Sequence, residues 1–584
     1  MPQPSTRRHT QRGRRQEYSD DDIPCTALVD AAFNKALNPS EILQQVRRNL
    51  SLISVSDIHY DPACPGPGLT VPLATSSACI HGISRLVKDS KTIRPHILNQ
   101  VIDLWPRLLP WIMFFFNQVV LRRPELFIDT ATESKPDALL TFSRTGTISG
   151  LVLSSFMLKL PSILHDSQDM ISCVAQVWIV SSEHRLVSLS ELMPVFFVRD
   201  EPLTKILIQT VKQELSVTRV TLVLSRLIHD IDCVDIAWDV IRDDLEMVRV
   251  LSEDPSLGLS FCLAKSTPWV CYILSRAVEA PTRFLEEEDG LGQIVITRCI
   301  NCIQLALLRG PCWIAQALKH THFLRSLLRC SLIKPSMDLS KILSQVLEVI
   351  TINLVWRGIL RQVSKSFAKM NISVINSPSF PFKLAQSWVT LLEVVEHRWW
   401  TRTKLHGDSK GKNLCMNEEC ETVDETRKTE AKFYRCSGCG WTFCSLSCRT
   451  AASGTHRESC RQERIRRKEG YPEDVMLRDE PFLRCVLPTD LQHEEEQIEK
   501  QTHGFYAKLS SDNKVLAVTC MDYRSVPMKV SVGQVEEYDT SVPDPAQWKR
   551  EVERAKRSKR KGRLVFSIFP CGSTPKTFID WIPL

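Results

Sequence analysis

Helical periodicity runs through most of the first 400 residues and restricts the fold more than any other feature. In NPSEILQQVRRNL, apolar residues Ile42, Leu43, Val46 and Leu50 recur at helical spacing, and Ser40 is the expected N-cap. Alternating strand patterns are nearly absent from this part of the chain. The same helical pattern recurs in the segments PLTKILIQTVKQEL, VDIAWDVIRDDLEMVRVL, QIVITRCINCIQLALL and DLSKILSQVLEVITINLVW.

The predicted helical domain, residues 25–402, is too long to surround one core. Single hydrophobic cores stop growing at about 250–300 residues. A stacked array of helix pairs, resembling an armadillo or HEAT solenoid, would bury this much apolar surface. PWIMFFF, PWVCYIL and PCWIAQAL look alike but set no fixed period, so an irregular helical domain is the alternative.

The two ends of the chain have a different character. Residues 1–24 form a basic, polar segment with little apolar surface, which predicts a disordered tail. Residues 481–584 predict a small α+β module, in which PDPAQWKREVERAKRSKR is a helix with Asp544 as N-cap and Pro545 in its first turn. The expected strands are FLRCVL, KVLAVTCMDY, MKVSVGQVEEY and RLVFSIFP. Because this module is small beside the helical segment, the predicted fold class of the whole chain is mainly α.

The sequence predicts an intracellular protein of the nucleus, the cytoplasm or both. The first residues lack the apolar stretch of a secretory signal. The most apolar segment, LLPWIMFFF at 108–116, is shorter than the ~20 residues of a membrane span, and we expect a buried core helix there. Thiols stay reduced inside cells, so clustered cysteines indicate a metal site and not disulfides.

Seven of the 21 cysteines lie within residues 415–460, between a polar linker at 403–414 and a basic helix tail and linker at 461–480. Ordinary reduced cysteines are the alternative, but this segment offers few apolar residues to bury them. Tetrahedral zinc takes four such ligands, and eight are present, so the count predicts two Zn²⁺ ions per chain. The candidate ligands form four pairs: Cys415 and Cys420, Cys436 and Cys439, Cys444 and Cys448, and His456 and Cys460.

These spacings and side chains resemble the MYND-type zinc finger, over Cys415–Cys460 alone. The match is close at RCSGC, residues 435–439, and at FCSLSC, residues 443–448. The resemblance implies an interleaved pairing that the ligand count does not provide. One zinc would be held by Cys415, Cys420, Cys444 and Cys448, and the other by Cys436, Cys439, His456 and Cys460.

One departure from that family concerns peptide binding. MYND fingers that capture proline-rich peptides usually carry Gln after the sixth ligand and Trp five residues after that ligand, where this chain has Arg449 and Ser453. We therefore expect weak or absent binding of such peptides. Trp441 is expected to pack in the finger's own core, with a substitute aromatic surface as the alternative.

Other notable residues have ordinary explanations. Cys299 and Cys302 lie in a strongly apolar helix, where reduced core cysteines are expected. Lys549–Arg563 holds nine basic and two acidic residues, which predicts a solvated helix face, with a nuclear-import signal or a site for an acidic partner as alternatives. The net charge of +7 permits a nucleic-acid partner but does not by itself indicate one.

The sequence predicts a non-enzymatic, zinc-binding scaffold or adaptor for protein partners. The phosphate-loop, serine-hydrolase, metalloprotease and dinucleotide motifs are absent from the sequence. A nuclear transcriptional co-regulator is the first alternative. A divergent SET-type lysine methyltransferase is the second, although the Asn-His-Ser-Cys and Gly-Glu-Glu-Leu steps of those enzymes are missing.

Overall fold

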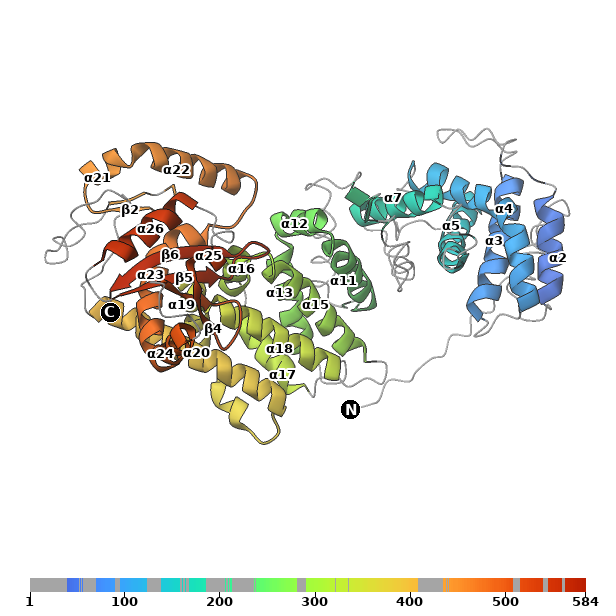
Figure 1. The fold of residues 1–584 in the computed structure, drawn as a ribbon. Coiled ribbons are helices and arrows are strands. Elements are labelled where there is room, and N and C mark those ends of the chain that lie inside the picture. Colours follow the sequence, from blue (N-terminus) through green and yellow to red (C-terminus); the bar gives the residue numbers. More distant parts are fainter. Residues whose placement is uncertain are drawn as a thin grey trace, which may run out of the picture. The chain divides into compact units, whose positions relative to one another are not determined.

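The computed structural model forms two compact units, Met1–Glu214 and Leu215–Leu584, each with its own core (Figure 1). The predicted helical segment, 25–402, extends over both. Besides a few isolated residues, the structure describes residues 39–51, 70–89, 95–122, 138–157, 168–184, 238–280, 290–320, 322–333, 336–407, 434–436, 438–439, 441–507, 515–538, 545–558 and 562–583.

Every element described in the first unit is a helix, and these helices pack around large aromatic side chains. Trp111, Phe115, Phe116 and Trp178 are each at most 2% exposed. α3 packs against α5 and α2, and the apolar segment at 108–116 is a buried core helix, as expected. The elements are α2 (Pro39–Leu50), α3 (Thr70–Asp89), α4 (Pro95–Phe114), the π-helix η4 (Phe115–Val120), α5 (Ala138–Met157) and α7 (Gln168–His184).

The second unit begins with a larger set of helices, which Figure 1 draws from green to yellow. They are α11 (Trp238–Ser252), α12 (Pro255–Leu263), α13 (Ser266–Glu279), α15 (Leu291–Leu307), α16 (Pro311–His320), α17 (Phe323–Leu332), α18 (Met337–Ile352), η7 (Asn353–Val355), α19 (Arg357–Phe367), η8 (Ile372–Asn376) and α20 (Phe382–Gly407).

Each of these helices packs against a few others that lie nearby in the sequence. α11 packs on α15, α15 on α18, and α18 on α20, while α13 packs on α16 and α17. Apolar side chains fill the contacts, and Trp356 and Trp388 are fully buried. α20 continues to Gly407 and therefore enters the predicted linker at 403–414.

A four-stranded mixed sheet lies at the C-terminal end, in the order β4-β3-β5-β6. β3 and β5 are parallel, and the other two pairs are antiparallel. α26 covers one face of the sheet with Trp548 and Val552, against Val518 and Phe566. The elements are α23 (Val475–His493), α24 (Glu495–Ala507), β3 (Ala517–Asp522), β4 (Lys529–Gln534), α25 (Val535–Tyr538), α26 (Pro545–Arg557), β5 (Gly562–Phe569) and β6 (Lys576–Pro583).

Residues around the end of β5 join the sheet to the helices. The buried indole N–H of Trp356 donates a hydrogen bond to the carbonyl oxygen of Pro570 at 2.9 Å. The ring of Trp356 also packs on Phe569, with centroids 6.3 Å apart. Gly572 has φ +67°, and a Cβ there would lie 2.5 Å from the carbonyl oxygen of Arg309, so only glycine fits this close approach.

A buried ion pair joins α20 to α23. Arg398 donates hydrogen bonds to both carboxylate oxygens of Asp490, at 2.6 and 2.7 Å, and His397 lies 2.9 Å from the same carboxylate. Burial would raise the pKa of Asp490, but the charge of Arg398 and the hydrogen bonds of both partners hold it below its usual value. This carboxylate is therefore ionised and fixes one helix against the other.

The coarse prediction of a mainly helical chain with a small C-terminal α+β part is confirmed. The prediction of a strand at FLRCVL is wrong, because these residues lie inside α23. Their buried positions, Phe482, Leu483, Val486 and Leu487, follow helical spacing. Ser40 lies within α2, which begins at Pro39, so it is not the N-cap.

The remaining local expectations have mixed outcomes. α26 begins at Pro545 as predicted, while its expected cap, Asp544, lies outside the described residues. β6 was not expected. The tail at 1–24 and most of PLTKILIQTVKQEL also lie outside the described residues.

Length and hydropathy argue against a membrane-crossing helix wherever the structure describes the chain, since no single helix there meets both requirements. One bent pair, Pro255–Leu263 with Ser266–Glu279, meets them together by length and composition alone. Core helices of other proteins meet the same test.

Candidate metal centre

A short hairpin positions the first two candidate ligands. β1 (Tyr434–Arg435) pairs antiparallel with β2 (Thr442–Phe443), and the backbone N–H of Cys436 donates to the carbonyl oxygen of Trp441 at 2.8 Å. These bonds hold the two ends of a tight turn that contains Gly438 and Cys439. The turn directs the sulfur atoms of Cys436 and Cys439 to the same side.

The other two ligands come from one helix. α22 (Ser453–Lys468) carries His456 and Cys460, which are four residues apart and therefore lie on one face. Both side chains are buried, at 8% exposure each. The Nε2 atom of His456 is buried and has no hydrogen-bond partner among the described residues. A buried nitrogen without a partner needs an explanation, and a role as metal ligand provides one.

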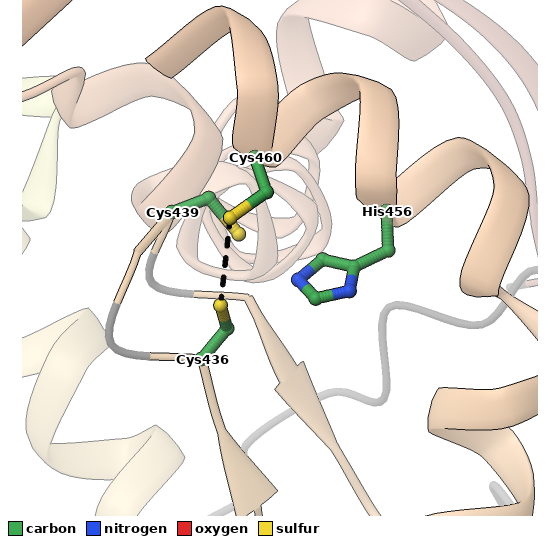
Figure 2. Close-up of side chains that lie close together, drawn as sticks. All are labelled: Cys436, Cys439, His456 and Cys460. Carbon is green, nitrogen blue, oxygen red and sulfur yellow. Dashed lines mark hydrogen bonds between the residues drawn. The ribbon is translucent and has the colours of Figure 1, made fainter. Parts of the chain in front are cut away.

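Figure 2 shows the four side chains around a common point, with the imidazole ring of His456 turned toward the three sulfur atoms. The ligand atoms of Cys436, Cys439, His456 and Cys460 all lie within 4.8 Å of one another. The sulfur atoms of Cys436 and Cys460 are 3.9 Å apart. Three thiols and one imidazole at these separations form a donor set that zinc accepts in tetrahedral sites.

The proton affinities of the two turn cysteines differ widely. Burial would raise the pKa of Cys436, but hydrogen bonds from the backbone of Cys439 and Gly438 lower it to about 6. Burial and the neighbouring Cys436 raise the pKa of Cys439 to about 12. A thiolate is the form that binds a metal, so Cys436 is ready for that role at neutral pH.

Gly438 is required by the geometry of the turn. A Cβ at this position would lie 2.6 Å from the sulfur of Cys460 and 3.6 Å from the sulfur of Cys436. The backbone N–H of Gly438 also lies 3.4 Å from the sulfur of Cys436. A side chain here would therefore enter the space between two ligands.

A small apolar core supports the cluster. Phe443 is fully buried and Trp441 is 9% exposed, and both rings pack against the imidazole of His456, with centroids 5.2 and 5.7 Å away. The expectation that Trp441 packs inside the finger is confirmed, because it belongs to this core with Ala452. The finger thus has more core than its few apolar residues suggested.

A second pair of predicted ligands lies beside the first four. The sulfur atoms of Cys444 and Cys448 are 3.4 Å apart, at the start of α21 (Leu446–Ala451). Their expected partners, Cys415 and Cys420, lie outside the described residues. The described chain therefore holds one four-ligand cluster and one pair.

Sequence reasoning missed two supporting residues. Ser445 caps α21, because its hydroxyl accepts a hydrogen bond from the backbone N–H of Cys448 at 3.1 Å, and a serine directly before a helix is a recognisable signal for this. Glu463 is 2% exposed on α22 and pairs with Arg467 at 2.8 Å. No sequence signal marks Glu463 as buried.

The predicted core cysteines differ from the finger cysteines. Cys299 and Cys302 are free thiols buried in α15, as expected. Burial raises the pKa of Cys302 to about 12 and that of Cys299 well above its ordinary value. Both are protonated and unreactive at neutral pH.

The end of α22 contacts the helices of the same unit. Gly470 has φ +91° and turns the chain, so that Tyr471 packs on Trp313 of α16, with ring centroids 6.2 Å apart. Arg466 lies 5.5 Å from the Tyr471 ring and forms a 2.6 Å salt bridge with Asp474. The metal cluster is therefore carried on a helix whose far end is anchored.

Comparison with known proteins assigns no family to the chain. No family model and no curated protein matches it. Among solved structures, the crystal structure of SYS-1 is similar over 69% of this chain and 91% of its own length, with 11% sequence identity and a TM-score of 0.23. A TM-score this low carries no argument about fold or function.

Proposed function

We propose that this protein is a non-enzymatic scaffold or adaptor that binds protein partners through a MYND-type zinc finger and a helical-repeat body. The observation that carries the proposal is the cluster of Cys436, Cys439, His456 and Cys460. Its ligand set equals the one that the resemblance implies for one MYND zinc. A metal there would supply a structural cross-link between the hairpin and α22.

The proposal includes a second zinc ion. The close approach of Cys444 and Cys448 supports it, because two sulfur atoms 3.4 Å apart are half of a tetrahedral site. Cys415 and Cys420 would complete that site. The protein would then carry two Zn²⁺ ions per chain.

The finger would bind partners differently from fingers that capture proline-rich peptides. Such peptides need an aromatic wall, and Trp441 is buried in the finger's own core. Arg449 is exposed on α21, at the position where peptide-binding fingers have glutamine. A partner of this finger would offer a carboxylate to Arg449.

A nuclear transcriptional co-regulator is the second candidate, favoured by α26. That helix buries Trp548, Val552 and Ala555 against the sheet and exposes basic residues such as Lys549 and Arg550. An exposed basic helix would be accessible to an import receptor or an acidic partner. Imaging compares the location of the wild-type protein in the cell with that of a variant whose basic residues on α26 are neutralised. A wild-type protein in the nucleus and a variant in the cytoplasm would support the nuclear role.

The test combines metal analysis with partner capture. Purified protein should contain two zinc ions per chain, and Cys436→Ser should lower that number and release partners captured through the finger. Cys312→Ser is the matched control, because Cys312 is a half-buried thiol outside the cluster. One zinc per chain in the wild-type protein would refute the two-ion proposal, and unchanged partner capture by Cys436→Ser would refute the role of the finger.

A further inference from the structure

Three arginines gather where α19 meets the last turns of α20. Arg357 and Arg361 are one turn apart on α19 and therefore share a face. The end of α19 contacts the beginning of α20, since the rings of Phe367 and Trp388 are 6.4 Å apart. The charges of Arg357 and Arg361 both act on Arg402, which places the start of α19 near the last turns of α20.

The guanidinium group of Arg402 lies over an aromatic ring and forms no salt bridge with a described acidic residue. It lies 4.3 Å from the centre of the Trp399 ring, a cation–π distance. Its Nη1 atom is buried and has no hydrogen-bond partner in the part of the chain that the structure describes. Burial, followed by the positive charges of Arg357 and Arg361, lowers the pKa of Arg402.

Nearby carboxylates are committed to other groups. Asp490 is ion-paired with Arg398, the inward-facing arginine four residues before Arg402. Asp479 accepts a hydrogen bond from the backbone N–H of Gly358 and so caps the start of α19. Among the described residues, no acidic side chain forms a salt bridge with Arg357, Arg361 or Arg402. Three cations without a partner repel one another, and a bound anion would relieve that repulsion.

Exposed aromatic surface borders the arginines. Trp399 is 42% exposed and Trp400 is 54% exposed, in a unit whose other large side chains are mostly buried. Exposed aromatic groups beside charged ones are typical of surfaces that bind proteins. The three arginines could therefore bind an anionic group of a partner, while the exposed tryptophans could contact apolar residues next to that group.

We propose that Arg357, Arg361 and Arg402, with Trp399 beside them, bind a phosphorylated serine or threonine in a peptide segment of a protein partner. A phosphoryl group carries about −1.5 to −2 charges and three acceptor oxygens at neutral pH, which suits three guanidinium donors. One carboxylate carries a single charge and two oxygens, and leaves one arginine unpaired. This inference rests on the proposed scaffold function and names the chemistry of one partner.

The experiment is calorimetric titration of the full-length protein with acetyl-Gly-Leu-phosphoserine-Leu-Gly-amide. Three further probes are the same peptide with serine, the same peptide with glutamate, and inorganic phosphate. We expect the phosphopeptide to bind at least ~10-fold more tightly than each of these, because charge-assisted pairs and the Leu–Trp contact act together. Binding should weaken with added salt.

Two variants and one control locate the site. Arg361→Gln changes an exposed residue and should keep the fold, while Arg402→Gln removes the half-buried guanidinium that lies over Trp399. Each should weaken phosphopeptide binding by about 10-fold or more. Arg550→Gln, an exposed arginine on α26, changes the net charge equally and should bind within about twofold of wild type.

Several results would overturn the proposal. If the serine or glutamate peptide binds as tightly as the phosphopeptide, the site does not require a phosphoryl group. If inorganic phosphate binds as tightly, the peptide contributes nothing to the affinity. Unchanged affinity in Arg361→Gln and Arg402→Gln would place binding elsewhere. Cys436→Ser distinguishes this site from the finger: it should retain phosphopeptide binding even if partner capture through the finger fails.

Discussion

Cys302 and Cys436 lie in the same compact unit, yet the first thiol has a pKa of about 12 and the second about 6. Cys302 is buried among apolar side chains of α15, where burial dominates. Cys436 lies at a hairpin end, where burial is outweighed by hydrogen bonds. Cysteine is thus a small apolar residue in the helices, whereas at the hairpin it is suited to bind a metal.

The same contrast separates the two regions as a whole. The helices are held by large buried side chains such as Trp356 and Trp388. The segment with the four candidate ligands has only Phe443, Trp441 and a few small residues as its core, so a metal bound by the cluster would supply much of its stability. The difference is one of core size, and it predicts that the helices and the cluster respond differently to removal of a metal.

The largest expected effect comes from removing the metal. A structural zinc supplies an apparent binding free energy of about 10–16 kcal/mol, so chelation should unfold the hairpin and the start of α22. The helices should keep most of their circular dichroism at 222 nm, because their core contains none of the cluster. Metal analysis with dichroism checks this, and a single transition that melts the helices as well would show that the two regions are one cooperative unit.

Trp356→Ala should have the next largest effect, on the helices. Loss of a fully buried tryptophan costs about 3–5 kcal/mol in free energy of unfolding, and here it also leaves the carbonyl of Pro570 without its donor. Urea unfolding measures this value. Trp400→Ala, at a 54% exposed position, is the control and should change stability by less than about 1 kcal/mol.

Thiol alkylation compares the two kinds of cysteine directly. In metal-free protein at pH 7, Cys436 should react with iodoacetamide at least ~100-fold faster than Cys299 or Cys302, because loss of the metal exposes Cys436 to solvent while the other two thiols stay buried and protonated in α15. Mass spectrometry of alkylated peptides after timed quenching checks the ratio. Equal labelling of the three residues would contradict it.

Ser445→Ala should have the smallest effect. Loss of an N-cap costs about 1 kcal/mol, and here it would loosen α21 around Cys448. We expect a modest loss of zinc affinity in competition with a chelator. Thr450→Ala is the control, because Thr450 is exposed on α21 and its hydroxyl bonds the carbonyl oxygen of Leu446 and not the cap.

The candidate metal ligands could be predicted from the sequence, but the packing of the side chains around them could not. Spacing alone identified Cys436, Cys439, His456 and Cys460 as candidate ligands, because a short pair lets one turn or one helix face supply two donors to a tetrahedral site. The grouping of these four came from the family resemblance, since the count of eight allows other pairings. The packing of Trp441 and Phe443 on His456 depends on the folded hairpin and has no spacing signal.

The C-terminal part shows why other features could not be predicted from the sequence. FLRCVL is a short apolar run, which suits a buried strand and a buried helix equally well, and the extended pattern of α23 decides for the helix. The ion pair of Arg398 and Asp490 and the arginines at α19 and α20 depend on residues that are distant in sequence. Local periodicity contains no information about such contacts.

The hydrogen bond from Trp356 to Pro570 also has a consequence for the timing of synthesis. The two residues are 214 positions apart, so at a translation rate of about 5–20 residues per second the indole waits roughly 10–40 s for its acceptor. During that interval the surface that will bury Trp356 and Phe569 together is open to water. A chaperone that covers this surface on the ribosome would protect the nascent chain until its last strands emerge.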